Sequence, residues 1–164
     1  MGLSLSHCSS PCSSITEGTS NFMHSQMFQP PPINKKLVSI IKNFPGLQLY
    51  DIPNSINKDH MISVLKTASG LTNKWIIFSH GNAATLFQYY DYILELHNRL
   101  EVGVLIYDYP GYGLSTGIPT DESCVETLKV VVSHMVADYA ISMKNIILMG
   151  QSIGTGVVMK YAYK

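Results

Sequence analysis

The sequence predicts an α/β protein, with a mostly parallel sheet and helices on both faces. Three continuous apolar runs, at residues 75–78, 102–107 and 146–149, have the length and composition of strands that are buried on both sides. The segments that follow them have apolar residues at the three- and four-residue spacing of a helix. Strands that alternate with helices in this way form a parallel sheet with right-handed crossovers.

The composition is that of a globular chain without marked charge. Of 164 residues, 46% are hydrophobic and 13% are charged, with 11 basic residues against 11 acidic ones. This balance argues against a nucleic-acid partner, which requires a basic surface. The apolar runs are far shorter than the roughly 20 residues of a membrane-spanning helix, and the amino terminus lacks the pattern of a signal peptide. Three cysteines, an odd number, fit a reducing compartment better than a disulfide framework.

The amino terminus carries a pattern for lipid attachment. Gly2 and Ser6 occupy the positions of an N-myristoylation signal, and Cys8 and Cys12 follow closely. One myristoyl chain holds a protein on a membrane only weakly, so S-acylation of Cys8 or Cys12 would supply the second anchor. This interpretation places the chain on the cytoplasmic face of membranes as a peripheral, lipid-anchored protein. The alternative is an unmodified, disordered tail, because short patterns of this kind also arise by chance.

A change of composition divides the chain near residue 32. Residues 9–29 are rich in Ser, Thr and Asn without a sustained period, which is typical of a flexible tether. The prolines at 30–32 then stiffen the chain, and they cannot enter a helix interior or a central strand. We therefore expect a flexible, lipid-carrying tail over residues 1–32 and a folded domain, or part of one, over residues 33–164.

The first part of the domain has the weakest signal. Short apolar or alternating runs at residues 37–41, 47–50 and 61–65 are separated by Pro, Gly and Asn, and they predict the strands of an antiparallel start. The segment after 75–78 predicts a helix whose buried stripe consists of Leu86, Tyr89, Tyr90, Ile93, Leu96 and Leu100.

Thr120 is expected to cap the next helix, with Asp121 and Glu122 in the first turn, where negative charge is favourable. The buried stripe expected for this helix consists of Val125, Leu128, Val132, Met135, Val136 and Tyr139. A last helix is expected over residues 153–163.

Each of the three buried strands is followed by a loop that contains glycine. In a parallel sheet, ligands and catalytic groups collect beyond the carboxyl ends of the strands, so the loops at 79–83, 108–113 and 150–154 are expected to form the site. The last loop is Gly-Gln-Ser-Ile-Gly, whose glycines permit a sharp strand-to-helix turn that exposes the hydroxyl of Ser152. The spacings fit neither a phosphate-binding loop nor a metal site. We expect Ser152 to be a nucleophile, with no metal and no cofactor.

Together the three loops resemble the α/β-hydrolase fold. They read Ser-His-Gly-Asn-Ala at 79–83, Tyr-Asp-Tyr-Pro-Gly-Tyr-Gly-Leu-Ser-Thr-Gly at 107–117 and Gly-Gln-Ser-Ile-Gly-Thr-Gly at 150–156. More narrowly, they look like the alpha/beta hydrolase domain-containing 17 group, whose members remove palmitate from S-acylated proteins. The chain departs from that group at Thr85, where an aspartate is usual, and at Pro110, where a serine is common.

The group is held on membranes by an acylated, cysteine-rich amino terminus, and this resemblance supports acylation of Cys8 and Cys12. Here the chain departs again, because it has a myristoylation-like start and only two cysteines in that region. The partners implied are an S-acylated protein, or another acyl ester or thioester, and a membrane surface.

These motifs imply the chemistry of a serine hydrolase. Ser152 would attack an ester or thioester carbonyl, and the backbone N–H of Ile153, at the start of a helix, would stabilise the oxyanion. By resemblance, the N–H of Asn82 is the second oxyanion donor. His80 is expected to be a hydrogen-bonded structural residue, and Asp108 is expected to bind backbone N–H groups of its own loop.

The acid and the histidine that complete such a site come after the nucleophile in the chain. Few residues follow Ser152, so we expect the domain to be truncated after the nucleophile elbow and nearly inactive by itself. Two interpretations remain open. One is the amino-terminal half of a membrane-tethered acyl-thioesterase that acts on S-acylated proteins. The other is a catalytically inactive, lipid-anchored fragment or splice form with a binding or regulatory role.

Overall fold

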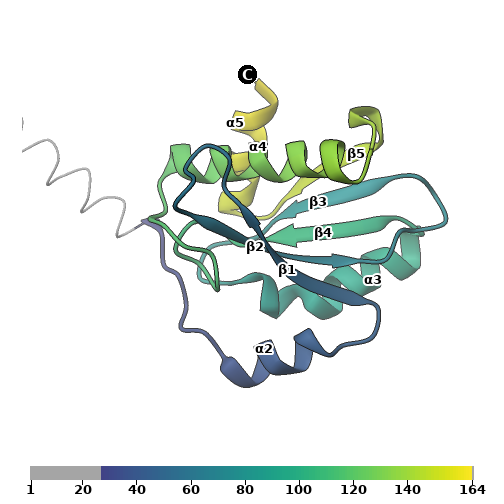
Figure 1. Ribbon diagram of the computed structural model, residues 1–164, viewed down its shortest axis with the longest axis horizontal. Helices are drawn as coiled ribbons and strands as arrows, with labels where there is room; N and C mark the ends of the chain where they lie inside the picture. The colour runs from purple at the N-terminus through teal and green to yellow at the C-terminus, as the bar shows by residue number, and fades with distance from the viewer. Residues whose placement is uncertain (1–26, 164) are drawn as a thin grey trace, which may run out of the picture.

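The folded part of the chain is built on a five-stranded sheet (Figure 1). A computed structural model describes residues 27–163, so Gly2, Cys8 and Cys12 and the lipid anchor predicted for them lie outside the described residues. The sheet has the order β1-β2-β4-β3-β5. Its strands are β1 (Leu47–Pro53), β2 (Met61–Thr67), β3 (Trp75–Ser79), β4 (Gly103–Tyr107) and β5 (Ile146–Gly150).

The strand directions confirm the predicted, mostly parallel sheet. β2 is antiparallel to both β1 and β4, whereas β3 is parallel to both β4 and β5. Every strand of this sheet except β2 therefore runs in the same direction. The carboxyl ends of β3, β4 and β5 lie at the same end of the sheet, where the three glycine-containing loops begin.

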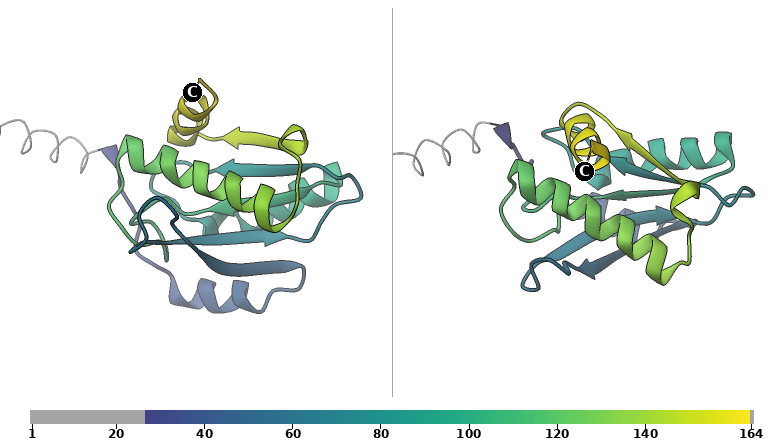
Figure 2. Two further views of the ribbon diagram at one scale, coloured as in Figure 1. Left: turned by 45° about the horizontal axis from the view of Figure 1, so that its top comes forward. Right: turned by 90° about the horizontal axis from the view of Figure 1, so that it is seen from above.

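Helices cover both faces of the sheet (Figures 1 and 2). Helices α2 (Lys35–Lys42) and α3 (Tyr90–Leu100) lie on one face, and α4 (Asp121–Asp138) and α5 (Ile153–Tyr163) lie on the other. Short 3₁₀ helices at Leu86–Tyr89 and Met143–Asn145 lead into α3 and β5. The predicted α/β architecture, with helices on both faces, is confirmed.

The side chains of the central strands alternate between two cores. β3 and β4 are buried at every position. Ile76 and Phe78 pack in the core on the side of α2 and α3, while Trp75 and Ile77 pack in the core on the side of α4 and α5. This alternation is the two-residue period of a strand, and burial on both sides explains why residues 75–78 include no polar position.

The strand prediction for residues 37–41 is wrong, because these residues belong to helix α2. Asn34 caps the helix: its side-chain oxygen accepts a hydrogen bond of 3.2 Å from the backbone N–H of Leu37. Leu37, Val38 and Ile41 have helical spacing and contact the same core, and Ile41 is fully buried. The prediction failed because an apolar run of this length fits the period of a strand and that of a helix.

Helix α4 begins at the residue that the sequence predicts. The side-chain oxygen of Thr120 accepts a hydrogen bond of 3.0 Å from the backbone N–H of Ser123. Of the predicted stripe, the fully packed members are Val125, Leu128, Val132 and Met135. Val136 is 36% exposed, and Leu100 of α3 is 51% exposed, so these two predictions of burial are wrong. Both residues lie in the last turn of their helix.

The packed structure starts ahead of the three prolines. Phe28 is 7% exposed and belongs to the core on the side of α4 and α5. The backbone N–H of Gln29 donates to the side chains of Asn82 and Tyr112, at 3.0 Å each. These two residues precede position 33, where the domain was expected to start. The contact of Phe28 could not be predicted from the sequence, because the residues around it in the segment 9–29 are mostly polar.

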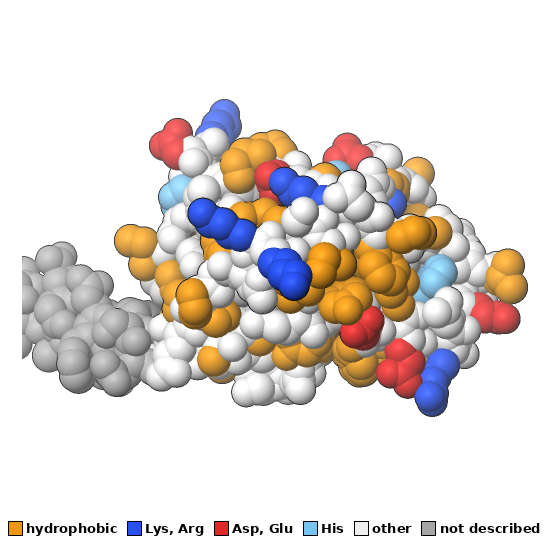
Figure 3. All heavy atoms as spheres, turned by 90° about the horizontal axis from the view of Figure 1, so that it is seen from below, with side chains coloured by type: hydrophobic (Ala, Val, Ile, Leu, Met, Phe, Trp, Pro, Cys, Tyr) orange, Lys and Arg blue, Asp and Glu red, His pale blue; other side chains and the backbone are white. Residues whose placement is uncertain are grey.

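Within residues 27–163, none of the helices combines the length and the apolar character needed to cross a bilayer. Seen from the side of α2, the surface carries apolar side chains with charged ones between them (Figure 3).

Strand β5 is the edge of the sheet within the described residues, where it pairs only with β3. Ile147 of this strand is 46% exposed. An exposed apolar edge offers unpaired backbone groups to a second chain, so we expect Ile147→Lys to reduce self-association. Light scattering after size-exclusion chromatography, over a range of protein concentrations, measures this. The control is Leu71→Lys, which adds the same charge at a loop residue that is 87% exposed. An equal effect of the two variants would contradict an origin at the edge.

Candidate active site

The turn between β5 and α5 has the geometry of a nucleophile elbow. Gln151 and Ser152 connect the two elements, and Ser152 is exposed. The backbone of Ser152 has φ of 53°, in the left-handed region that residues with a side chain rarely adopt. Such strain persists only where the surroundings impose it, and it is frequent at functional sites.

Two glycines make this turn sterically feasible. A Cβ atom on Gly150 would overlap the carbonyl oxygen of Gly154, and a Cβ atom on Gly154 would overlap the carbonyl oxygen of Ser79. All of these partners are backbone atoms, which cannot rotate away as a side chain does. The first turn of α5 therefore lies directly on the end of β3, and the spacing of Gly, Ser and Gly in the sequence follows from this close approach.

The loop after β3 lies beside the elbow. The backbone N–H of Gln151 donates to the carbonyl of Ser79 at 3.0 Å, which joins the elbow to the last residue of β3. A Cβ atom placed on Gly81 would lie 3.7 Å from the Cβ atom of Ser152. The structure thus brings Ser152 and Ile153 together with the loop that carries Asn82.

Two backbone N–H groups at this place have no acceptor among the described residues. They belong to Asn82 and Ile153, and neither donates a hydrogen bond to any part of residues 27–163. Ile153 is the first residue of α5, where the helix leaves its N–H groups unpaired and its dipole favours negative charge. The two N–H groups are therefore available to an oxyanion.

Tyr89 links the elbow to the loop after β3, a contact that the sequence did not reveal. Its hydroxyl donates to Gln151 Oε1 at 2.7 Å and accepts a longer hydrogen bond, 3.4 Å, from the backbone N–H of Gly81. Its ring packs edge-on against Phe78 with 5.2 Å between the ring centroids. The helical pattern predicts the packing of this ring, but the hydroxyl serves two loops that lie far away in the chain.

We expect Tyr89→Phe to loosen the elbow without disturbing the core. Removing the hydroxyl deletes the hydrogen bond to Gln151, so the unfolding free energy should fall by about 1 kcal/mol. The rate at which Ser152 reacts with a fluorophosphonate probe should fall as well, since the turn is less well held. Urea denaturation and time-resolved probe labelling measure the two effects. The control is Tyr92→Phe, because the ring of Tyr92 also packs against Phe78. A matching loss of labelling rate in both variants would contradict the role of the Tyr89 hydroxyl.

His80 and Asp108 form a fully buried pair beside this loop. His80 Nε2 lies 3.4 Å from Asp108 Oδ1, and His80 Nδ1 donates to the carbonyl of Gly81 at 2.8 Å. Asp108 Oδ1 also accepts a hydrogen bond of 2.7 Å from the backbone N–H of Leu86. Asp108 therefore binds a backbone N–H of the 3₁₀ helix that follows β3, in addition to the N–H of Leu114 in its own loop, where the sequence places its bonds. Burial raises the pKa of Asp108, while His80 and the N–H groups of Leu86 and Leu114 act in the opposite direction.

The nearby phenol and thiol groups keep their protons at neutral pH. Burial raises the pKa of Tyr112 to about 12, and its hydroxyl donates to Asn82 Oδ1 at 2.7 Å. Burial likewise raises the pKa of Cys124, in α4, to about 12. A thiol is nucleophilic only as the thiolate, so Cys124 is an unreactive packing residue. Within the described residues, no three His, Cys, Asp or Glu side chains are grouped so that they could hold a metal ion.

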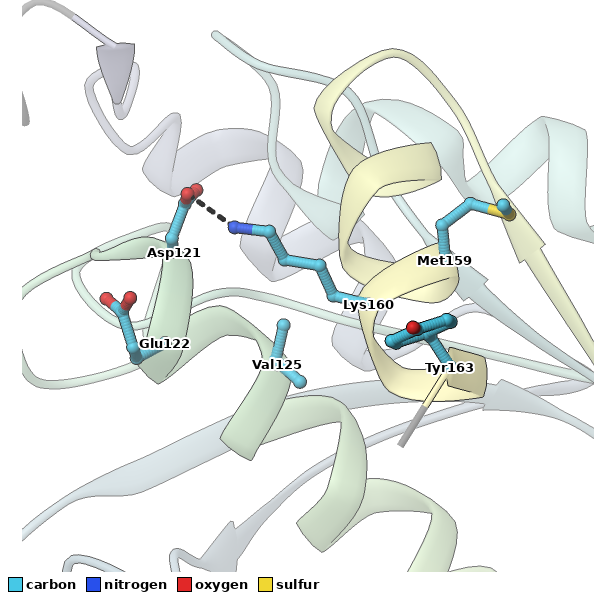
Figure 4. A pocket seen from close by; sticks show the side chains of 6 residues that line it. All are labelled: Asp121, Glu122, Val125, Met159, Lys160 and Tyr163. Atoms are coloured by element: carbon cyan, nitrogen blue, oxygen red, sulfur yellow. Dashed lines mark hydrogen bonds and ion pairs between the residues drawn. The ribbon is translucent and has the colours of Figure 1, made fainter.

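A pocket of about 480 Å³ opens between α4 and α5 (Figure 4). It is lined by Asp121, Glu122, Val125, Met159, Lys160 and Tyr163. Lys160 Nζ donates to Asp121 Oδ2 at 2.6 Å and so connects the two helices. A smaller pocket of about 220 Å³ shares Asp121, Val125 and Lys160 with the first and extends to Met27, Phe28 and Ile153. Apolar surface therefore begins beside the residue that follows Ser152.

The fold and the elbow agree with a match to a known family. Residues 71–164, more than half of the chain, match the family described as serine aminopeptidase, S33. The chain belongs to this family of α/β hydrolases. The chain is 45% identical over 92 residues to an alpha/beta hydrolase of Acanthamoeba polyphaga mimivirus. This match covers 56% of this chain and 35% of the viral protein. It is 39% identical over 80 residues to the human alpha/beta hydrolase domain-containing protein 17C, covering 49% of this chain and 24% of that protein.

Solved structures agree on the α/β-hydrolase fold. An α/β hydrolase from Vibrio vulnificus superposes with a TM-score of 0.71 at 18% identity, over 95% of this chain and 53% of that one. The esterase Pf2001 of Pyrococcus furiosus superposes with a TM-score of 0.64 at 23% identity, over 82% of this chain and 52% of the esterase. The hydrolase chain thus spans about half the length of these structures, and its matches span about a quarter to a third of the curated relatives.

Proposed function

We propose that the protein is a serine hydrolase that cleaves acyl esters or thioesters, with Ser152 as the nucleophile. The observation that carries this proposal is the strained, exposed Ser152 at the turn from β5 to α5. Two glycines are required there by close backbone contacts, and the N–H groups of Ile153 and Asn82 have no acceptor within residues 27–163. A turn of this kind presents a hydroxyl to a substrate and serves no packing purpose.

In the proposed reaction, Ser152 Oγ attacks the carbonyl carbon and the carbonyl oxygen becomes an oxyanion. The N–H groups of Ile153 and Asn82 donate to this oxygen, and each such donor contributes about 2.7 to 4 kcal/mol of transition-state stabilisation. The leaving thiol or alcohol departs as the carbonyl re-forms, which leaves an acyl-enzyme at Ser152. Water then attacks this ester, releases the fatty acid and restores the serine.

A histidine must take the proton of Ser152, and a carboxylate must orient that histidine. Among the residues that the structure describes, none forms a hydrogen bond with the Ser152 hydroxyl. We place the base and the acid outside residues 27–163.

The proposed acyl substrate is a palmitoyl thioester on a membrane protein. Similarity to alpha/beta hydrolase domain-containing protein 17C supports this choice, as do the lipidation patterns at Gly2, Cys8 and Cys12. The apolar surface beside Ile153 would receive the acyl chain.

The test uses two proteins, the chain itself and the longest reading frame that contains it. Each is incubated with a fluorophosphonate probe and with an S-palmitoyl peptide on vesicles, and released palmitate is measured. We expect the longer protein to be labelled at Ser152 and to release palmitate. Release from an O-palmitoyl serine peptide at the same rate would contradict a preference for thioesters. Labelling of neither protein would exclude the hydrolase and favour the non-catalytic, lipid-anchored form.

A further inference from the structure

Residues 27–29 are held on the loop after β3 by one side chain. Asn82 Nδ2 donates to the carbonyl of Met27 at 2.6 Å, and Asn82 Oδ1 accepts from the backbone N–H of Gln29 at 3.0 Å. The side-chain amide of Asn82 thus donates one hydrogen bond to the backbone of residues 27–29 and accepts one from it, as the backbone of a paired strand does. Aspartate has no donor, so it cannot make both bonds.

The residue between these two hydrogen bonds anchors the segment in the core. Phe28 is 7% exposed and joins the cluster that contains Tyr109, Tyr112 and Val125. We refer to residues 27–29 as the amino-terminal strap. Met27 and Phe28 also line the smaller pocket together with Ile153, so the strap lies beside both residues whose N–H groups face the proposed oxyanion.

The loop that carries Asn82 needs support from outside. Ala83 has φ of 53°, in the left-handed region, and its N–H donates to Asn82 Oδ1 at 2.9 Å. Tyr112 donates to the same oxygen at 2.7 Å. A strained backbone keeps its conformation only when neighbouring groups hold it. Here these bonds converge on the side chain of Asn82, whose own backbone N–H finds no acceptor in the described part of the chain.

We propose that the amino-terminal strap sets the position of the Asn82 N–H, and that the Asn82 side chain and Phe28 are positioning residues for the reaction. The proposal rests on the hydrolase function proposed above. When the strap is in place, Asn82 holds its loop at the elbow. When the strap is released, the loop moves and the oxyanion loses a donor. The strap therefore influences the reaction through its hydrogen bonds to Asn82.

The test compares deletion of residues 2–29 with deletion of residues 2–26 in the longest reading frame that contains the chain. The first deletion removes the strap and the second retains it. Hydrogen exchange at the backbone amides of Gly81 and Ala83, which donate to Tyr89 and Asn82, reports the position of the loop without any need for activity. We expect exchange to rise about tenfold in the first deletion, since two hydrogen bonds to Asn82 are lost, and to stay unchanged in the second. Equal exchange in the two deletions would overturn the proposal.

A second variant covers the case in which the first deletion does not fold. Asn82→Asp keeps the size of the side chain but replaces the donor to Met27 with a charged oxygen that repels the Met27 carbonyl, so it too should raise exchange. For the reaction, we expect Phe28→Ala to lower kcat about tenfold, and Phe28→Leu, which still fills the core, to restore kcat. A rise in exchange with unchanged kcat would overturn the link to the oxyanion. If the unaltered protein reacts with no probe and no thioester, the proposed function fails, and the exchange result alone decides whether the strap positions the loop.

Discussion

Gly154→Ala is expected to destabilise the protein by about 3 kcal/mol and to disorder the elbow. The added methyl group would overlap the carbonyl oxygen of Ser79, and the carbonyl of His80 lies only 2.8 Å from the same position. Both are backbone groups, and Ser79 is a fully buried residue of β3. The helix must therefore move away from the sheet, which separates Ser152 from the loop of Asn82. Urea denaturation measures the unfolding free energy, and probe labelling of Ser152 reports the elbow.

Gly156→Ala is the matched control for this prediction. Gly156 lies two residues further along α5, and a Cβ atom placed there meets nothing within 4 Å. Alanine has a higher helix propensity than glycine, so this variant should gain about 0.5 to 1 kcal/mol. Similar stabilities of the two variants would show that α5 does not approach β3 as closely as the structure indicates.

Ser152→Ala is expected to abolish probe labelling and to lower hydrolysis of an acyl thioester by about 10⁶-fold in a protein that contains the complete site. The reason is that the attacking oxygen is gone, while the oxyanion donors and the binding surface remain. Single-turnover release of palmitate, compared with the unaltered protein, measures the loss. Retention of activity would mean that another residue is the nucleophile.

A companion variant, Ser152→Gly, separates catalysis from stability. Glycine adopts the left-handed conformation of this residue without the steric penalty that serine and alanine share. Both variants should be inactive, but Ser152→Gly should be more stable than Ser152→Ala by about 1 kcal/mol. Thermal and urea denaturation detect this difference. Equal stabilities would indicate that the turn is not strained at Ser152.

Much of the fold could be predicted because its signals are local. The runs that form β3 and β4 are apolar at consecutive positions since both faces are covered, and Thr120 precedes α4 at the capping position. The elbow was equally predictable, because the two glycines stand next to Ser152 in the sequence. Residues 37–41 were assigned wrongly since four apolar residues in a run of five do not distinguish a helix from a strand.

The supporting contacts of the site could not be predicted, because their partners are far apart in the chain. Asn82 binds Met27, Gln29 and Tyr112, and Tyr89 binds Gln151. No local pattern of polarity or spacing pairs such residues. A tyrosine in a helical stripe predicts a buried ring, but its hydroxyl finds a partner only when the loops are assembled. The position of Asn82 was predictable from the motif, whereas the role of its side chain was not.

The place of β3 in the sheet also determines the order in which the molecule can fold. β3 pairs with β4 on one side and with β5 on the other, and β5 comes much later in the chain. During synthesis, β1 to β4 and α4 can assemble before β5 leaves the ribosome. Until then, β3 lacks its second neighbouring strand. Contacts that close such long loops form slowly. The elbow thus forms after β1 to β4, and the side of β3 that β5 covers stays exposed in the nascent chain until β5 is made.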